Sequence, residues 1–129
     1  MNNHLSCLIV DDDLPCRLLA IEIFRKLNIE AQYASNGLEA IEICKLHLPD
    51  IIMLDWMMPK MNGLQFINAI KPIYLKKTPR IIMCSAKFDN NFIKESIIAG
   101  ADEYIRKPLH LADVERLIKT HNDRFRKCL

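Results

Sequence analysis

Short apolar runs and longer amphipathic segments alternate along the whole chain. The apolar runs are five or six residues long and rich in β-branched residues, which is typical of strands. They are LSCLIV (5–10), IEAQYA (29–34), IIMLD (51–55), RIIMCS (80–85) and DEYIRK (102–107). We therefore predict five strands, and the polar positions of the second favour a place at the edge of a sheet.

Each predicted strand is followed by a segment with apolar residues at helical spacing. These segments cover residues 14–28, 37–47, 63–71, 90–100 and 111–125. In the first, Leu18, Ile21 and Leu27 recur at helical spacing, and Gly100 is expected to end the fourth. Strand–helix alternation predicts right-handed crossovers and a parallel sheet with helices on both faces. Five units are too few for an eight-stranded barrel, so we expect an open, doubly wound α/β sheet of flavodoxin-like strand order 2-1-3-4-5.

The composition is that of an ordinary globular protein. The 129 residues, half of them apolar, carry a formal net charge of +2, and we expect one domain over 1–129 with a core spanning about 5–120. The five cysteines form no Cys-x-x-Cys or Cys/His cluster, which favours reduced thiols and a cytoplasmic location. Because no apolar run approaches the roughly 18 residues of a membrane span and the net charge is small, we expect neither membrane insertion nor direct nucleic-acid binding.

Acidic side chains follow two strands that this strand order makes neighbours. Asp11, Asp12 and Asp13 follow the first strand and Asp55 ends the third. Adjacent strands lie about 4.8 Å apart, and two carboxylates about 5 Å apart repel by roughly 3 kcal/mol at an effective dielectric near 20. The cluster therefore predicts a cation, and its oxygen-only ligands favour Mg²⁺. Asp13 is equally well explained as the N-cap of the next helix, with Pro15 in the first turn.

Two more polar side chains end the fourth and fifth predicted strands. Ser85 supplies a hydroxyl and Lys107 an ammonium group. Either alone would be explained structurally. Together with the acids and a metal they suit a phosphoryl group, because Lys107 can neutralise its oxygens, Ser85 can donate a hydrogen bond, and an aspartate can attack in line.

Four blocks, LIVDDD, MLDWMMPKMNG, IIMCSA and EYIRKPL, together resemble the receiver domain of two-component response regulators, in particular the chemotaxis-type single-domain proteins. The resemblance spans essentially the whole chain. It implies a signalling switch with no output domain, phosphorylated by a histidine kinase or histidine phosphotransfer protein. Such a protein signals through a downstream protein target, as a monomer or weak homodimer. It is not an enzyme in the conventional sense, because it catalyses only its own phosphorylation and slow self-dephosphorylation.

The resemblance also implies a role for each matching residue. Asp55 would be the phosphoacceptor. Asp12 and Asp55 would bind Mg²⁺ directly, with the Met57 carbonyl as the third protein ligand and Asp11 acting through water. Lys107 would be the phosphate-sensing lysine, and its bond to the following proline would be cis.

The remaining matches concern switching and the lifetime of the phosphoryl group. Ser85 would move toward the phosphoryl oxygens, and Tyr104 would be an aromatic switch that rotates inward. Met57 and Lys87 occupy positions that tune the lifetime in this family. Because Met57 offers no polar side-chain group to orient an attacking water, we predict self-dephosphorylation over minutes or longer. Trp56, which follows the acceptor, is expected to be a surface aromatic residue.

Two other functions stay open on the residues alone. A haloacid-dehalogenase-like, Mg²⁺-dependent aspartyl phosphohydrolase would use Asp11 and Asp13 as its Asp-x-Asp pair. No cap insertion accompanies that pair, and the block LDWMMP would then have no explanation. A receiver-like interaction module that is never phosphorylated is the third possibility, against which the full acidic set argues.

Overall fold

Five parallel strands form a single sheet in the order β2-β1-β3-β4-β5. The computed structural model describes residues 5–74, 78–86 and 89–128, of which 122–128 are described as backbone only. The strands are β1 (Cys7–Val10), β2 (Ala31–Ala34), β3 (Ile51–Leu54), β4 (Arg80–Ser85) and β5 (Glu103–Arg106). The strand order and the edge position of β2 confirm the prediction, and β4 has the predicted bounds.

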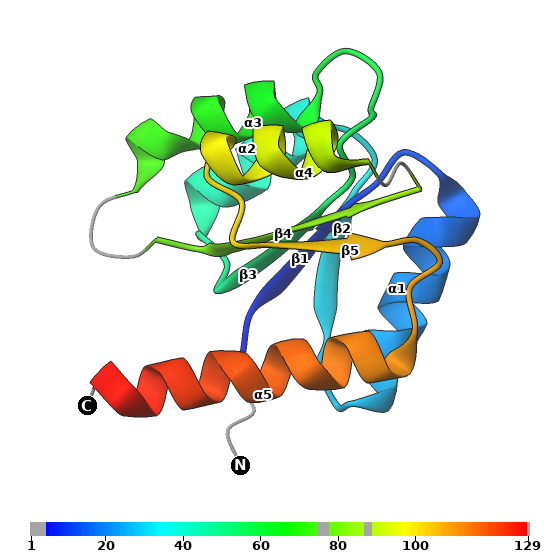
Figure 1. The fold of residues 1–129 in the computed structure, drawn as a ribbon, viewed down its shortest axis with the longest axis vertical. Coiled ribbons are helices and arrows are strands. Elements are labelled where there is room, and N and C mark those ends of the chain that lie inside the picture. Colours follow the sequence, from blue (N-terminus) through cyan, green and yellow to red (C-terminus); the bar gives the residue numbers. More distant parts are fainter. Residues whose placement is uncertain (1–4, 75–77, 87–88, 129) are drawn as a thin grey trace.

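Helices cover both faces of the sheet, as predicted for a doubly wound fold. They are α1 (Leu14–Lys26), α2 (Gly37–Leu46), α3 (Gly63–Ile70), the short 3₁₀ helix η1 (Lys71–Ile73), α4 (Asn90–Ala99) and α5 (Leu111–Cys128). Helices α1 and α5 lie on one face, and α2, α3 and α4 lie on the other (Figure 1). Among the described residues, no helix combines the length and apolar character needed to cross a bilayer.

The central strands are apolar on both faces because each face is covered. In β1, Leu8 and Val10 belong to the core beneath α2, α3 and α4, whereas Cys7 and Ile9 belong to the core beneath α1 and α5. Alternate residues of a strand point to opposite faces. This double burial explains why the runs in β1, β3 and β4 are nearly continuous rather than alternating.

The helical spacing of Leu18, Ile21 and Leu27 correctly predicts α1 but does not identify its buried face. Leu18 is 54% exposed, and the buried residues of α1 are Ala20, Ile23 and Phe24. The apolar residues of this helix nearly encircle it, so spacing alone did not identify the face that packs on the sheet.

The predicted exposure of Trp56 was wrong. Its side chain is only 6% exposed, and its ring meets the ring of Phe92 in α4 edge-to-face, with centroids 6.2 Å apart. The Trp56 carbonyl accepts a hydrogen bond from Gly63 at 2.9 Å, which folds the β3–α3 loop back over the core. A residue in a loop is therefore buried because α4 packs against that loop.

Helix caps determine where the loops at the carboxyl edge of the sheet end. The Asp13 carboxylate caps α1 by accepting the Cys16 amide at 3.1 Å, as the structural interpretation of Asp13 predicted. Asn62 and Gln65 form a capping box at the start of α3, with both hydrogen bonds at 2.9 Å. These caps hold the β1–α1 and β3–α3 loops, which carry the acidic residues.

Candidate functional site

The sheet ladder brings the acidic residues of β1 and β3 side by side. Val10 pairs with Leu54, and the Asp55 amide donates to the Val10 carbonyl at 3.0 Å. On the other side, the Asp11 amide donates to the Ala34 carbonyl at 3.1 Å. Asp11 and Asp55 therefore occupy equivalent places, one residue beyond the ends of adjacent strands. This is the point where the strand order reverses, which is where doubly wound sheets bind ligands.

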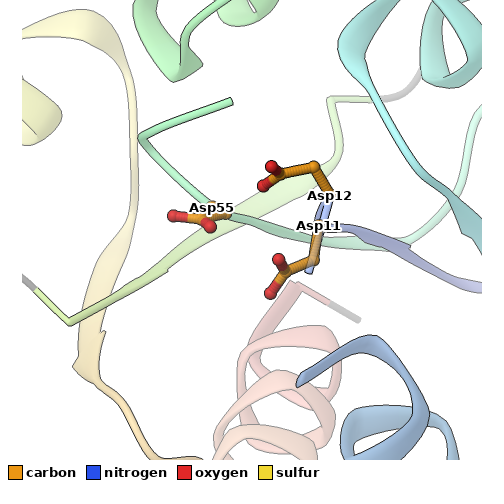
Figure 2. Close-up of side chains that lie close together, drawn as sticks. All are labelled: Asp11, Asp12 and Asp55. Atoms are coloured by element: carbon orange, nitrogen blue, oxygen red, sulfur yellow. The ribbon is translucent and has the colours of Figure 1, made fainter. Parts of the chain in front are cut away.

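Three carboxylates converge at this edge of the sheet. Asp11, Asp12 and Asp55 each offer an oxygen, and these oxygens all lie within 4.8 Å of one another. Figure 2 shows the three side chains gathered from the ends of the two strands. Asp11 and Asp55 are buried, whereas Asp12 is exposed. The cluster is thus closed toward the core and open toward solvent. An all-oxygen, strongly negative donor set of this kind fits Mg²⁺, which binds a few carboxylates and keeps several waters.

Lys107 bridges the two buried acids. Its Nζ lies 2.8 Å from Asp11 Oδ2 and 3.2 Å from Asp55 Oδ2. Its backbone amide donates to the Ser85 carbonyl at 2.9 Å, which extends the β4–β5 ladder and holds the lysine at the site. The Lys107–Pro108 bond is cis, as the family resemblance implied. Burial alone would lower the pKa of Lys107, but its hydrogen bonds and ion pairs with the two acids outweigh burial and raise it.

The environment of Asp55 makes its carboxyl group less acidic than usual. Burial is the largest cause, and together with the nearby Asp11 charge it raises the pKa of Asp55 to about 6. Lys107 and the Met57 amide, which donates to Asp55 Oδ1 at 3.2 Å, act in the opposite direction. At neutral pH the group is therefore mostly ionised, in a partly desolvated state in which a carboxylate is a better nucleophile.

The two predicted switch residues, Ser85 and Tyr104, lie in contact. Ser85 is buried at the end of β4, and Tyr104 is half-buried in β5. Burial raises the pKa of Tyr104, whereas a hydrogen bond with the Ser85 side chain lowers it. The Met57 side chain is 53% exposed beside the site. Lys87, the other predicted tuning position, lies outside the described residues.

Asp13 is separate from the acid cluster. Its carboxylate is used as the α1 cap, and its hydrogen bonds with Cys16 lower the pKa of Asp13. Its amide donates to Asp11 Oδ1 at 3.0 Å, so the two acids face different ways. The Asp-x-Asp pair required by the phosphohydrolase hypothesis therefore does not form one site.

A small cavity of about 40 Å³ lies behind the cluster. It is lined by Ile9, Val10, Asp11, Cys16, Leu19, Ala20, Met53, Asp55, Cys84, Lys107, Pro108 and Leu109. Its walls are mostly apolar, and its size corresponds to about one or two water molecules. The apolar side chains that line this cavity contribute to the burial of Asp55 and Lys107. Cys16 and Cys84 on its wall are free thiols, as are Cys7 and Cys44.

Arg17 contacts the site and was not identified from the sequence. Its Nη1 donates to the Asp11 carbonyl at 2.8 Å, and its guanidinium carbon lies 5.7 Å from the centroid of the Tyr33 ring. The available signal was its position, one helical turn beyond Asp13, where a long side chain can fold back over the β1–α1 loop.

A doubly wound sheet with three clustered acids at its switch point and a lysine from the last strand defines the receiver class of α/β signalling domains. The family model described as "response regulator receiver domain" matches residues 7–119. The chain therefore belongs to the response regulator receiver family.

Two curated relatives and one solved structure place the chain within this family. It is 38% identical over 117 residues to chemotaxis protein CheY of Bacillus subtilis, covering 89% of this chain and 96% of CheY. It is 32% identical over 114 residues to sporulation initiation phosphotransferase F of the same organism, covering 88% and 90%. A chain of the CheX–CheY–BeF₃–Mg²⁺ complex from Borrelia burgdorferi superposes with a TM-score of 0.81 at 33% identity, covering 90% of this chain and 87% of that one.

These similarities identify the general function of the chain. It is a two-component signalling receiver of the chemotaxis type, homologous to phosphotransfer signalling proteins. Receiver domains bind Mg²⁺ at an acidic site, and the cluster of Asp11, Asp12 and Asp55 is compatible with that ion. Neither the phosphohydrolase nor the module that is never phosphorylated is favoured by these relationships.

Proposed function

We propose that Asp55 is the phosphoacceptor of a signalling switch. The observation that carries this proposal is the setting of its carboxylate: buried at a strand end, 3.2 Å from the Lys107 ammonium, and within 4.8 Å of two further acids. Among the described carboxylates, only Asp11 shares this combination of burial, an ion pair with lysine and a place in the acid cluster. The Asp11 carboxylate has the shorter contacts, 3.0 Å to the Asp13 amide and 2.8 Å to Lys107, whereas both contacts of the Asp55 carboxylate measure 3.2 Å.

The transfer is an in-line displacement at phosphorus. An Asp55 carboxylate oxygen attacks the phosphoryl group carried by a histidine of a kinase or phosphotransfer protein. The new O–P bond forms as the N–P bond breaks, and the departing imidazole takes up a proton. Lys107 is placed to neutralise a phosphoryl oxygen, while the Met57 amide holds the attacking carboxylate in place.

Asp12 and Asp55 would hold Mg²⁺ directly, with the Met57 carbonyl as a third ligand and Asp11 acting through water. When bound, the ion supplies positive charge that offsets the acids and the incoming phosphoryl oxygens. The charges support this assignment: three carboxylates and one ammonium leave two negative charges at the site when all are ionised. A divalent cation balances them.

Switching follows from the contact between Ser85 and Tyr104. A phosphoryl group on Asp55 attracts the Ser85 hydroxyl and Lys107, and movement of Ser85 changes the hydrogen bond that it makes with Tyr104. The surface formed by α4, β5 and α5 then presents a different face to a target protein. Moving a mostly inactive ensemble to a mostly active one takes about 5 kcal/mol of differential stabilisation. We further propose a single receiver domain, acting in the cytoplasm through protein contacts as a monomer or weak homodimer.

The test is labelling with acetyl phosphate and Mg²⁺. The wild-type protein should take up at most one base-labile phosphoryl group per chain, with no uptake in EDTA and none in Asp55→Asn. Continuous turnover of a chromogenic phosphate ester would favour an enzyme instead. Equal labelling of wild type and Asp55→Asn would rule out Asp55 as the acceptor.

A further inference from the structure

We propose that Arg17, held against Tyr33, is a positioning residue that sets the orientation of the Asp11–Asp12 peptide and thereby the affinity of the site for Mg²⁺. This inference rests on the proposed function, because it concerns the same acidic site. It adds two residues, from α1 and β2, to the structural support of the metal ligands.

Every polar group of Asp11 is held by a different part of the chain. Its Oδ1 accepts from the Asp13 amide and its Oδ2 from Lys107, and its amide completes the ladder with β2. Its carbonyl oxygen accepts from Arg17 at 2.8 Å. That carbonyl belongs to the peptide group between Asp11 and Asp12, so the hydrogen bond from Arg17 fixes the orientation of this peptide group.

Asp12 depends on this backbone anchor more than its neighbours do. Asp11 and Asp55 are buried and paired with Lys107, whereas Asp12 is exposed. Among the side chains described for residues 5–74, 78–86 and 89–121, none forms a hydrogen bond that orients the Asp12 carboxylate. Its direction is therefore set by the peptide before it. If that peptide tilts, the Asp12 oxygen leaves the cluster in which all three acids come within 4.8 Å of one another.

The Arg17 guanidinium is suited to this task by its shape. One nitrogen reaches the Asp11 carbonyl while the planar group lies over the Tyr33 ring, 5.7 Å from its centroid. A lysine has a similar charge but neither the plane nor the fixed geometry of the donors. Tyr33 is 58% exposed at the edge strand β2, so its ring fills no part of the core and supports the arginine from outside.

A purely electrostatic role for Arg17 makes the opposite prediction. The guanidinium is close enough to the site to help lower the pKa of Asp13. A positive charge beside a cation site weakens cation binding, so removing that charge alone would tighten Mg²⁺ binding. Positioning predicts that binding weakens when Arg17 is removed, and weakens equally when lysine replaces it. The sign of the change therefore separates the two roles.

The experiment is a Mg²⁺ titration followed by the fluorescence of Trp56, the only tryptophan in the sequence and the neighbour of Asp55. The variants are Arg17→Met, Arg17→Lys, Tyr33→Leu and Tyr33→Phe, with Arg25→Met, an exposed arginine in the last turn of α1, as the matched control. We expect the dissociation constant for Mg²⁺ to rise about tenfold in both Arg17 variants and about threefold in Tyr33→Leu. Tyr33→Phe and Arg25→Met should bind like the wild type.

A second measurement separates positioning from general damage to the fold. The rate of phosphorylation by acetyl phosphate should fall in the Arg17 variants at low Mg²⁺ and return to within about twofold of wild type when Mg²⁺ is saturating. Melting temperatures in EDTA will show whether a variant is unfolded. If the Arg17 variants are unfolded, the test is the comparison of Mg²⁺ binding by Tyr33→Leu with that by Tyr33→Phe.

The possible failures are distinguishable. The inference would be overturned if Arg17→Met and Arg17→Lys bound Mg²⁺ as tightly as the wild type or more tightly. Full binding by Arg17→Lys alone would overturn it too, because the shape of the guanidinium would then be irrelevant. Absence of Mg²⁺ binding by the wild type would instead count against the proposed function.

Discussion

Replacing Asp55 with asparagine removes a buried charge while keeping the shape of the side chain. Asp55 is only 8% exposed, and its carboxylate lies near the negative charge of Asp11. The positive charge of Lys107 offsets this unfavourable environment only in part. In the absence of Mg²⁺ it is therefore a source of instability. We expect the Asp55→Asn protein to be more stable than the wild type, although it lacks the proposed phosphoacceptor.

The pKa of Asp55 sets the size of this effect. A rise from 3.8 to about 6 corresponds to about 3 kcal/mol at roughly 1.4 kcal/mol per pKa unit. Solvent reaches the site through the side occupied by Asp12, so screening reduces this value. We expect a gain of about 1–2 kcal/mol in the free energy of unfolding at neutral pH. The same change at exposed Asp12 should give less than about 0.5 kcal/mol.

The assay is urea denaturation in EDTA, at pH values from 4 to 8, for wild type, Asp55→Asn and Asp12→Asn. A carboxyl group whose pKa is raised on folding favours the folded state when it is protonated. This stabilisation of the wild type is complete below about pH 3.8 and is lost as the pH rises through about 6. The advantage of Asp55→Asn should therefore be greatest at pH 7–8 and disappear near pH 4. Saturating Mg²⁺ should reduce the difference in stability between Asp55→Asn and the wild type, because the ion stabilises the folded wild-type protein to which it binds.

Two results would show that burial of the Asp55 charge does not destabilise the protein. One is an Asp55→Asn protein that is less stable than the wild type at pH 7.5 in EDTA. The other is an equal gain for Asp12→Asn, which would show that general repulsion among the acids, rather than burial of Asp55, determines the effect.

Three further predictions concern other parts of the molecule. Lys60 adopts a left-handed conformation (φ 72°), so Lys60→Gly should raise the free energy of unfolding by about 1 kcal/mol and Lys60→Ala should not, as chemical denaturation will measure. Glu103 pairs with Arg80, which is buried, and with Arg116, so Glu103→Gln should lower the free energy of unfolding by about 2–3 kcal/mol. Glu42 forms an exposed pair with Lys45, so Glu42→Gln should lower it by less than about 0.5 kcal/mol. Similar losses in the two variants would contradict this expectation. Because Met57 has no polar side-chain group, loss of the phosphoryl label at neutral pH should take minutes or longer, and a half-life of seconds would show that water is oriented by another group.

Most of the fold was predictable because the sheet is covered on both sides. Double burial makes the central strands continuous apolar runs, and glycine and capping residues mark the helix ends, so element order and topology followed from local patterns. The faces of the helices were harder to predict. Leu18 is exposed although it follows the helical spacing, and Trp56 is buried although it lies in a loop. Both outcomes depend on which neighbouring element packs there, and this is a tertiary property.

The residues of the site likewise include some that local sequence patterns predict and one, Arg17, that depends on tertiary packing. The residues that end strands, Asp11, Asp55, Ser85 and Lys107, were predictable because the carboxyl ends of parallel strands meet at one edge. Arg17 was not, because its contact depends on a long side chain that folds back from a helix toward a backbone carbonyl. A hydrogen bond to the main chain leaves no motif in the sequence. The chemical roles of the site residues, including that of Lys87, stay predictions.

We propose that one carboxylate among the three clustered acids, that of Asp55, receives the phosphoryl group. The most direct measurement is reduction of the phosphorylated protein with borohydride, which converts an aspartyl phosphate to homoserine, followed by peptide mapping by mass spectrometry. We predict homoserine at position 55 alone, formed only when both Mg²⁺ and the phosphodonor were present. Homoserine at position 11 or 12, or a phosphoryl group found on a different type of side chain, would show that Asp55 is not the sole acceptor.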